Sequence, residues 1–437
     1  MTNTGQEQPS AKKSVVVIGG GFAGLECARR LASHHDVRIT LIDKNNYHQF
    51  QPLLYQVATA ILSPGNAAFA LRNILQSDSR VAVKMAEVTS VDLMARTAVT
   101  ADGQRYQGDF LVLAAGSQPN FFGTPGADRY AYPLYSLEDA EKLRSRLLAV
   151  LESVDRDPSL VRMGALSFVV VGAGPTGVEI SGALGDLTQR IAREVYKSLD
   201  WTRARVYLVD MAHAVLSAFS KESQEYAARI LKEHGVEVRL GAAVKEVTSS
   251  EVVLVDGTSI RTRTVIWAGG LKASPLSEHL GVKLGHGGRL DVQSDFSVKG
   301  APGVYAIGDF ANVSGSDGRP LPQLAAVAQQ AGRHCARNIS ALISGESAKP
   351  FEYFDKGIMA MIGRNAAVAE VGPHRHELTG PLAFAAWLGV HALLLTSARA
   401  RIDTFLEWAW DYFGSAHVEP VLDRPGQLNM DWSAGEK

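Results

Sequence analysis

The chain has 437 residues, 46% hydrophobic and 20% charged, which indicates a globular protein of two or three domains. Its formal net charge of -1 argues against nucleic acid as a partner, because nucleic-acid binding needs a basic face. With only two cysteines, a disulfide framework and a CxxC redox or zinc motif are excluded, and we expect no bound metal.

The first thirteen residues, MTNTGQEQPSAKK, are polar and lack the apolar run of a secretory signal. Together with the low cysteine content, this favours a reducing, cytoplasmic setting.

The first predicted element is an apolar strand that breaks into a glycine-rich turn and continues as a helix, VVVIGGGFAGLECA. Its G-x-G-x-x-G glycines are Gly19, Gly21 and Gly24. They permit, in turn, a tight strand-to-helix turn, close approach of a pyrophosphate, and close packing of helix on strand. The next strand ends at Asp43, 19 residues after Gly24, where a carboxylate can accept hydrogen bonds from ribose hydroxyls. This stretch predicts a dinucleotide site.

A third apolar strand, in the run FLVLAAGSQPN from Phe110 to Asn120, breaks into small residues around Gly116. We expect it to return the chain from the sheet to the bound nucleotide.

The strand-turn-helix pattern then repeats as VVVGAGPTGVEISG, with Gly172, Gly174 and Gly177 as its three glycines. The next strand ends at Asp210, 33 residues after Gly177, so we expect an extended helix or an insertion through QRIAREVYKSLDW. An isolated acid at a strand end is often only solvated. After a second fingerprint, the ribose role is favoured for this acid as for the first.

Two later strands also break into small residues. One lies in TVIWAGGLKASP, and the other, VYAIGDFA, ends in Gly308 and Asp309 before an Ala-rich helical stretch from Leu324 to Ile339. Asp309 is interpreted either as a helix N-cap or as a contact to a cofactor's sugar alcohol or phosphate.

The C-terminal part is unusually apolar. The run from Gly380 to Ala398 is uncharged apart from His391 and approaches the roughly 20 residues that span a bilayer. On the following predicted helix, one stripe is formed by Ile402, Phe405, Leu406, Ala409, Tyr412 and Phe413. Trp408 and Trp410 fall at the borders of this stripe. Either the helix packs on the protein's own core, or it lies in a membrane interface, where tryptophan is favoured.

Taken in order, these pieces resemble the two-dinucleotide-binding-domain flavoproteins of the glutathione-reductase superfamily. More narrowly, the chain is similar to the type II NADH dehydrogenases, the non-proton-pumping NADH:quinone oxidoreductases. The narrow match rests on YHQFQPLLYQVATAILSPG, GAGPTGVEISG, VYAIGDFA and FEYFDKGIMAMIGRNAAVAEVG, followed by the apolar tail.

The resemblance implies an α/β fold of two Rossmann-like dinucleotide-binding domains, glutathione-reductase-like, with a C-terminal amphipathic helical membrane-anchoring segment. The implied boundaries are 14–120 and 281–350 for an FAD-binding domain in two parts, 121–280 for an NADH-binding domain, and 351–437 for the membrane-association region. For that region we favour two helices lying in the interface over a hairpin through the bilayer.

The resemblance also assigns roles to residues. FAD is expected at Gly19, Gly21, Gly24, Asp43, Gly116, Gly308 and Asp309. NADH is expected at Gly172, Gly174, Gly177 and Asp210. Glu179 matches an acid near the nicotinamide and flavin, or it is an ordinary glutamate of a first helical turn. Lys356 matches a lysine near the flavin, or it is a solvated loop lysine.

The chain departs from the family at one motif. The family commonly carries A-Q-x-x-x-Q near the quinone, whereas this chain reads AAVAQQ from Ala325 to Gln330. Gln330 matches the second glutamine, and Ala326 stands where the first is expected.

The implied activity is hydride transfer from NADH to FAD, followed by two-electron reduction of a membrane quinone, ubiquinone or menaquinone. The expected location is peripheral, on the cytoplasmic face of the inner membrane. The expected partners include a second copy of the chain, in a possible homodimer. The cysteine content does not support disulfide reductases or sulfide:quinone oxidoreductases. The alternatives are a soluble FAD-dependent NAD(P)H diaphorase or ferredoxin reductase, and an NADH-responsive redox-regulated binding protein.

Overall fold

The computed structural model describes residues 12–396, 398–413, 421–422 and 432. Its contacts divide the chain into two units. Unit 1 comprises Met1–His48, Phe69–Gln118 and Leu271–Phe354; unit 2 comprises Gln49–Ala68, Pro119–Gly270 and Asp355–Lys437.

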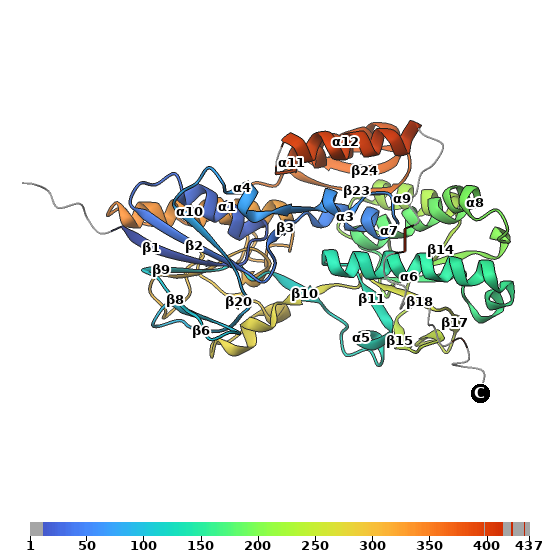
Figure 1. The fold of residues 1–437 in the computed structure, drawn as a ribbon, viewed down its shortest axis with the longest axis horizontal. Helices are drawn as coiled ribbons and strands as arrows, with labels where there is room; N and C mark the ends of the chain where they lie inside the picture. The colour runs from blue at the N-terminus through green and yellow to red at the C-terminus, as the bar shows by residue number, and fades with distance from the viewer. Residues whose placement is uncertain (1–11, 397, 414–420, 423–431, 433–437) are drawn as a thin grey trace, which may run out of the picture. The chain divides into compact units, whose positions relative to one another are not determined.

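Unit 1 is built on a five-stranded parallel sheet of order β21-β9-β1-β2-β5. Its strands are β1 (Lys13–Ile18), β2 (Val37–Asp43), β5 (Val81–Met85), β9 (Phe110–Leu113) and β21 (Val304–Ala306). Figure 1 shows α1 (Phe22–Leu31) and α10 (Ala325–Ile343) along one face. A three-stranded antiparallel sheet comprises β6 (Val88–Asp92), β7 (Thr97–Thr100) and β8 (Arg105–Gln107).

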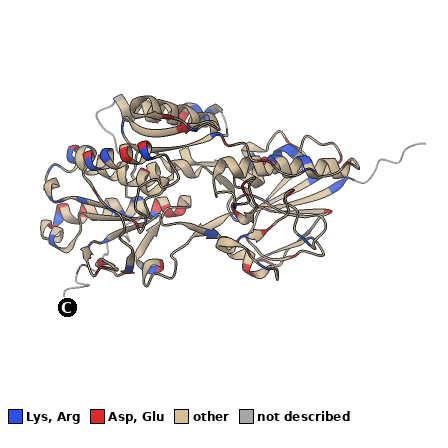
Figure 2. Cartoon of the chain, turned by 180° about the vertical axis from the view of Figure 1, so that it is seen from behind, with Lys and Arg blue, Asp and Glu red and all other residues tan. Residues whose placement is uncertain are grey.

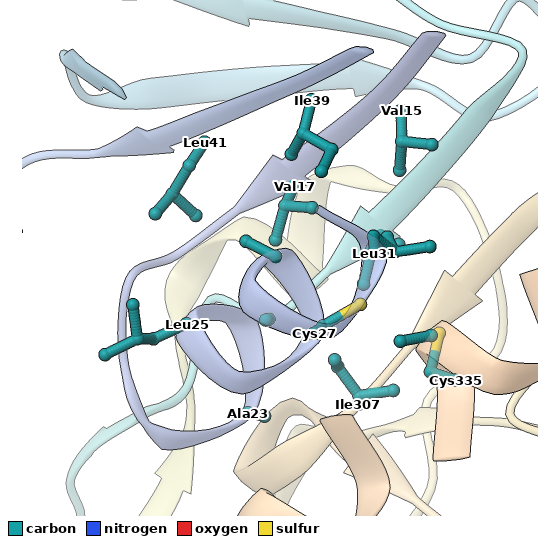
Figure 3. Packing of buried hydrophobic residues seen from close by; sticks show 14 of the residues in the cluster. Val15, Val17, Ala23, Leu25, Cys27, Leu31, Ile39, Leu41, Ile307 and Cys335 are labelled. Atoms are coloured by element: carbon teal, nitrogen blue, oxygen red, sulfur yellow. The ribbon is translucent and has the colours of Figure 1, made fainter. Parts of the chain in front are cut away.

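Alternation along β1 divides the unit 1 core into two layers. Val15 and Val17 pack with α1 and α10, as Figure 3 shows. Val16 and Ile18 point to the other face and join a cluster that includes Ala98 of β7. The sheet is therefore covered on both faces, as a parallel sheet requires.

The two cysteines meet where α1 crosses α10. Cys27 and Cys335 are free thiols in the buried cluster of Figure 3. Burial raises the pKa of the Cys335 thiol well above its usual range, which keeps the thiol protonated and unreactive. The crossing is close, since a Cβ on Gly332 would lie 2.2 Å from the Ala23 carbonyl oxygen. Both cysteines are therefore packing residues of the unit 1 core.

Unit 2 contains a second five-stranded parallel sheet of order β11-β18-β12-β13-β14. The strands are β11 (Ala131–Pro133), β12 (Ser167–Val171), β13 (Arg205–Val209), β14 (Val236–Arg239) and β18 (Thr264–Trp267). Helices α6 (Leu137–Arg156), α7 (Pro175–Asp186) and α9 (Lys221–Glu233) contact it. Strands β15 (Val244–Val247), β16 (Glu251–Leu254) and β17 (Ser259–Arg261) form an antiparallel sheet. Two parallel-sheet domains confirm the expected α/β class.

The segment before Asp210, expected to be an extended helix or an insertion, continues the helix and then adds a turn. After α7 the chain forms a π-helical turn (Leu187–Ile191), then α8 (Ala192–Val195) and a 3-10 turn (Trp201–Arg203) before β13 begins.

The chain after residue 355 belongs to unit 2 and begins with strands that the sequence analysis did not anticipate. They are β23 (Gly357–Gly363), β24 (Ala366–Val371) and β25 (His376–Thr379), in one antiparallel sheet. Helix α7 packs on β23 so closely that a Cβ on Gly182 would lie 1.7 Å from the Ile362 carbonyl oxygen. The sheet then leads into α11 (Gly380–Leu394) and α12 (Ala398–Phe413).

Helix α12 packs on α2 (Leu54–Ala58) and α3 (Pro64–Ala67) of the same unit. Its buried residues are Ala400, Thr404 and Trp408. The expectation that Trp408 lies at a membrane-facing border is therefore wrong: Trp408 is only 7% exposed and its indole donates to Gln56. Gln56 of α2 accepts the hydrogen bond of the Trp408 indole, so this side of α12 packs toward the interior of unit 2.

Of the predicted apolar stripe of α12, Ile402, Phe405 and Leu406 are exposed, whereas Ala409 and Tyr412 are half-buried. We call the exposed large apolar residues of the two helices the apolar face: Leu382, Val390, Leu393, Leu394, Ile402, Phe405, Leu406 and Trp410. Figure 2 shows no charged residue on α11. Within the described ranges, no helix is both long enough and apolar enough to cross a bilayer.

Candidate functional site

The first glycine turn of unit 1 admits only glycine at two of its three positions. Gly19 has φ +103°, and a Cβ there would lie 2.2 Å from the Ala114 carbonyl oxygen. A Cβ on Gly24 would lie 1.9 Å from the Gly19 carbonyl oxygen. Gly21 is different: it precedes α1 as its N-cap and has nothing within 4 Å of its Cβ position. The turn thus leaves open space at the positive end of a helix, where a phosphate is stabilised.

Asp43, at the end of β2, is fixed beside this turn. One carboxylate oxygen accepts from the Gly20 amide at 2.6 Å and the other from the Asn45 amide at 2.7 Å. Burial raises the pKa of Asp43, opposed by these hydrogen bonds. The carboxylate is held at the strand end where a ribose would need it.

Three further predicted residues lie in the same unit. Gly116 follows β9 with φ +69°. Gly308 has φ +67°, and a Cβ added to it would lie only 2.9 Å from the Ala23 methyl group of α1. Asp309 accepts from the Ser117 hydroxyl at 3.0 Å, and burial raises its pKa. These contacts bring the predicted FAD residues of three separate chain segments together.

The second glycine turn, in unit 2, repeats the first. Gly172 has φ +106°, and its Cβ would lie 2.5 Å from the Ala268 carbonyl oxygen. A Cβ on Gly177 would lie 1.7 Å from the Gly172 carbonyl oxygen, while Gly174, the N-cap of α7, again has nothing within 4 Å.

Asp210 reproduces the arrangement of Asp43. Its carboxylate accepts from the Ala173 amide at 2.5 Å and from the Ala212 amide at 2.7 Å. The chain therefore carries two cradles of the same geometry, each with an open helix N-terminus and a fixed acid. Both cradles fit the pyrophosphate and ribose of a dinucleotide.

Glu179, on α7, is a buried acid. It is 9% exposed, and one carboxylate oxygen lies 3.4 Å from the Met361 amide that donates to it. Burial raises its pKa to about 8, opposed by Met361 and the Trp387 indole. At neutral pH the group is mainly a neutral carboxylic acid, which can donate a hydrogen bond or a proton.

Glu179 lines a cavity of about 380 Å³ in unit 2. The walls come from α2, α7, β23, α11 and α12, and most lining residues are apolar or aromatic. Tyr55 and Gln56 of α2 are lining residues that the sequence analysis did not single out. Their segment, QPLLYQVA, was nevertheless among the most specific pieces of the resemblance.

Gln330 and Lys356, which the resemblance places near the quinone and the flavin, do not line this cavity. The side-chain amide of Gln330, on α10, makes two hydrogen bonds to the backbone of Phe354. It donates to the Phe354 carbonyl oxygen at 2.9 Å and accepts from the Phe354 N–H at 3.0 Å. Lys356 is exposed just before β23, and its carbonyl oxygen accepts from the Gly372 amide at 3.0 Å.

Comparison with known proteins matches these features to one family. A family model described as pyridine nucleotide-disulphide oxidoreductase matches residues 13–332. The type II NADH:quinone oxidoreductase Ndh of Mycobacterium tuberculosis is 38% identical over 97% of this chain and 91% of its own length. That of Staphylococcus haemolyticus is 32% identical over 84% of this chain and 92% of its own length.

Among solved structures, NDH2 from Plasmodium falciparum in complex with NADH has a TM-score of 0.85. It covers 94% of this chain and 100% of that chain at 20% identity, and so shows the likeness of the fold. The curated relatives and the family model together show that the chain belongs to the pyridine nucleotide-disulphide oxidoreductases and, among them, to the type II NADH:quinone oxidoreductases.

Proposed function

We propose that this protein oxidises NADH and reduces a quinone by two electrons, with FAD as cofactor and without proton pumping. The observation that carries this proposal is the presence of two dinucleotide cradles together with an apolar cavity that holds a buried neutral acid.

The first cradle is proposed to hold FAD. Gly21 leaves room for the pyrophosphate at the start of α1, and Asp43 is fixed for the ribose. Bound FAD supplies two-electron chemistry between a hydride donor and a quinone. Asp309, which accepts from the Ser117 hydroxyl, contributes a carboxyl group whose raised pKa reflects its burial.

The second cradle is proposed to hold NADH. Gly174 leaves the corresponding space at the start of α7. Asp210 is oriented by two backbone amides, so it can accept from the adenosine ribose hydroxyls. The same carboxylate repels a 2′-phosphate, which favours NADH over NADPH.

The apolar cavity of unit 2 is proposed to accept the quinone head group. Its aromatic and aliphatic walls suit a flat, apolar ring. Glu179 is the proposed acid in this site, because its raised pKa keeps a proton available at neutral pH.

Gln330 and Lys356 keep proposed roles that rest on the family resemblance. For Gln330, the paired amide supports a role in ordering the chain at Phe354, two residues before Lys356. Lys356 is proposed to lie near the flavin.

The apolar face of α11 and α12 is proposed to rest in the interface of the inner membrane, on its cytoplasmic side. Burying each large apolar side chain contributes roughly 1.5 to 3 kcal/mol. Arg399, in the first turn of α12, has a side chain that is 91% exposed and lies 3.4 Å from the Asp403 carboxylate, and such an exposed cation suits anionic headgroups. A face with this chemistry fits a lipid surface.

Anaerobic spectroscopy tests the activity. We expect the purified protein to show bound flavin that NADH bleaches and that a ubiquinone or menaquinone analogue reoxidises over many turnovers. Flavin that NADH reduces but quinones do not reoxidise would instead identify a diaphorase or an NADH-responsive binding protein.

A further inference from the structure

The cavity of unit 2 contains a chain of three hydrogen bonds that runs between its walls. The Trp408 indole donates to the Gln56 side-chain carbonyl at 2.8 Å, and the Gln56 amide nitrogen lies 2.8 Å from the Tyr55 hydroxyl. The Tyr55 hydroxyl in turn lies 2.9 Å from the Met361 sulfur. All four residues line the cavity, and Tyr55 and Gln56 are each only 3% exposed.

The direction of this chain is fixed by its first member. An indole N–H is a donor only, so Gln56 must turn its carbonyl oxygen toward Trp408. Its amide NH₂ then faces Tyr55, whose oxygen becomes an acceptor. The usual ambiguity of a glutamine amide orientation is thereby removed.

The Tyr55 proton must consequently point away from Gln56. The acceptor it meets there is the Met361 thioether, which is a weak one. A strong donor is thus matched with a poor acceptor in an apolar cavity, where a ligand oxygen would form a much better hydrogen bond.

We propose that the Tyr55 hydroxyl donates a hydrogen bond to a carbonyl oxygen of the quinone, with Gln56 and Trp408 as the residues that position its proton. This inference rests on the proposed function. A quinone fits because it is a flat apolar ring whose only strong polar groups are acceptors. Tyr55 remains a donor over the working pH range, since burial and then the charge of Glu179 raise its pKa.

The primary test is Tyr55→Phe, which removes only the hydroxyl. We expect kcat/KM for decylubiquinone to fall about 10-fold, the fold-change that corresponds to one buried hydrogen bond. NADH-dependent reduction of ferricyanide, a hydrophilic acceptor with no need of an apolar cavity, should stay unchanged. The matched control is Tyr196→Phe, because Tyr196 is a buried tyrosine of unit 2 that donates to Glu152 at 2.8 Å and does not line the cavity.

A second variant tests the positioning role. In Trp408→Phe the Gln56 amide is free to rotate, so its carbonyl oxygen can capture the Tyr55 proton. We expect a selective loss with decylubiquinone, and a much smaller loss from the same change in a Tyr55→Phe background. Simple filling of space by Trp408 predicts additive losses instead.

The outcomes separate this inference from the proposed function. Absence of NADH:decylubiquinone turnover in the wild type would refute the proposed function. Wild-type turnover that Tyr55→Phe retains in full, or an equal loss with both acceptors, would overturn the role of Tyr55. If Tyr55→Phe loses its flavin or fails to fold, the Trp408→Phe variant provides the test. Quinone kinetics of Trp408→Phe equal to those of the wild type would then overturn the proposal.

Discussion

Glu179→Gln is expected to stabilise the protein increasingly as the pH rises from 5 to 8. Burial raises the pKa of Glu179 from its ordinary 4.5 to about 8. Between these values the folded protein keeps a proton that the unfolded chain releases, so the free energy of unfolding falls as pH rises. Glutamine has nearly the same shape and cannot ionise, so the variant escapes this loss.

The magnitude follows from the separation of the two pKa values, about 3.5 pH units. At about 1.4 kcal/mol per unit, the wild type loses about 5 kcal/mol relative to the variant by pH 8. For 437 residues unfolding together, the entropy of unfolding is on the order of 0.9 kcal/mol/K, which corresponds to a Tm difference of about 5 °C.

Differential scanning calorimetry of both holoproteins from pH 5 to 9 measures this difference. It should be near zero at pH 5, grow to pH 8 and then level off. Glu377→Gln, on exposed β25, is the matched control and should show no such growth. Tm curves of wild type and Glu179→Gln that stay parallel over this range would contradict a buried neutral acid.

Four further outcomes are expected. The wild type should use NADH about 100-fold better than NADPH in kcat/KM, and Asp210→Asn should narrow this ratio; equal use by the wild type would refute the assigned role. Gly182→Ala should cost about 3 kcal/mol or more in urea unfolding, since its Cβ would lie 1.7 Å from a carbonyl oxygen of β23. Gly389→Ala, with nothing within 4 Å, should instead stabilise α11 by about 0.5 to 1 kcal/mol. Ile402 and Trp410 are 59% and 72% exposed, and replacing both residues by glutamate should release the protein from anionic vesicles in a sedimentation assay. Undiminished vesicle binding by this double variant would exclude the apolar face as the docking surface.

The nucleotide cradles could be predicted from the sequence because their constraints are local. At Gly19 and Gly172 a positive φ and a nearby carbonyl oxygen leave no room for a side chain. The spacing of the glycines in the sequence therefore predicts the geometry of the turn. The acids Asp43 and Asp210 follow at the end of the next strand, again within one supersecondary unit.

The cavity could not be predicted in the same way, because its walls depend on contacts between distant segments. Tyr55 and Glu179 are separated by more than a hundred residues, and Met361 by almost two hundred more. The position of Trp408 on α12 was mispredicted for the same reason, because its partner Gln56 lies on the distant helix α2. Hydrophobic periodicity predicts that the apolar neighbours of Thr404 are more buried than Thr404 itself. In the structure Thr404 is fully buried, and its hydroxyl accepts a hydrogen bond from Asn66 of α3.

The division of the chain has a consequence for its synthesis on the ribosome. The chain passes between the two units five times along its length. Strand β21, the edge of the unit 1 sheet, begins 191 residues after β9, its neighbour, has ended. At roughly 5 to 20 residues per second, the emerging sheet waits on the order of 10 to 40 seconds with that edge unpaired. During this interval the nascent chain presents a template for unwanted strand pairing, so newly made protein should depend on chaperones far more than the finished protein does.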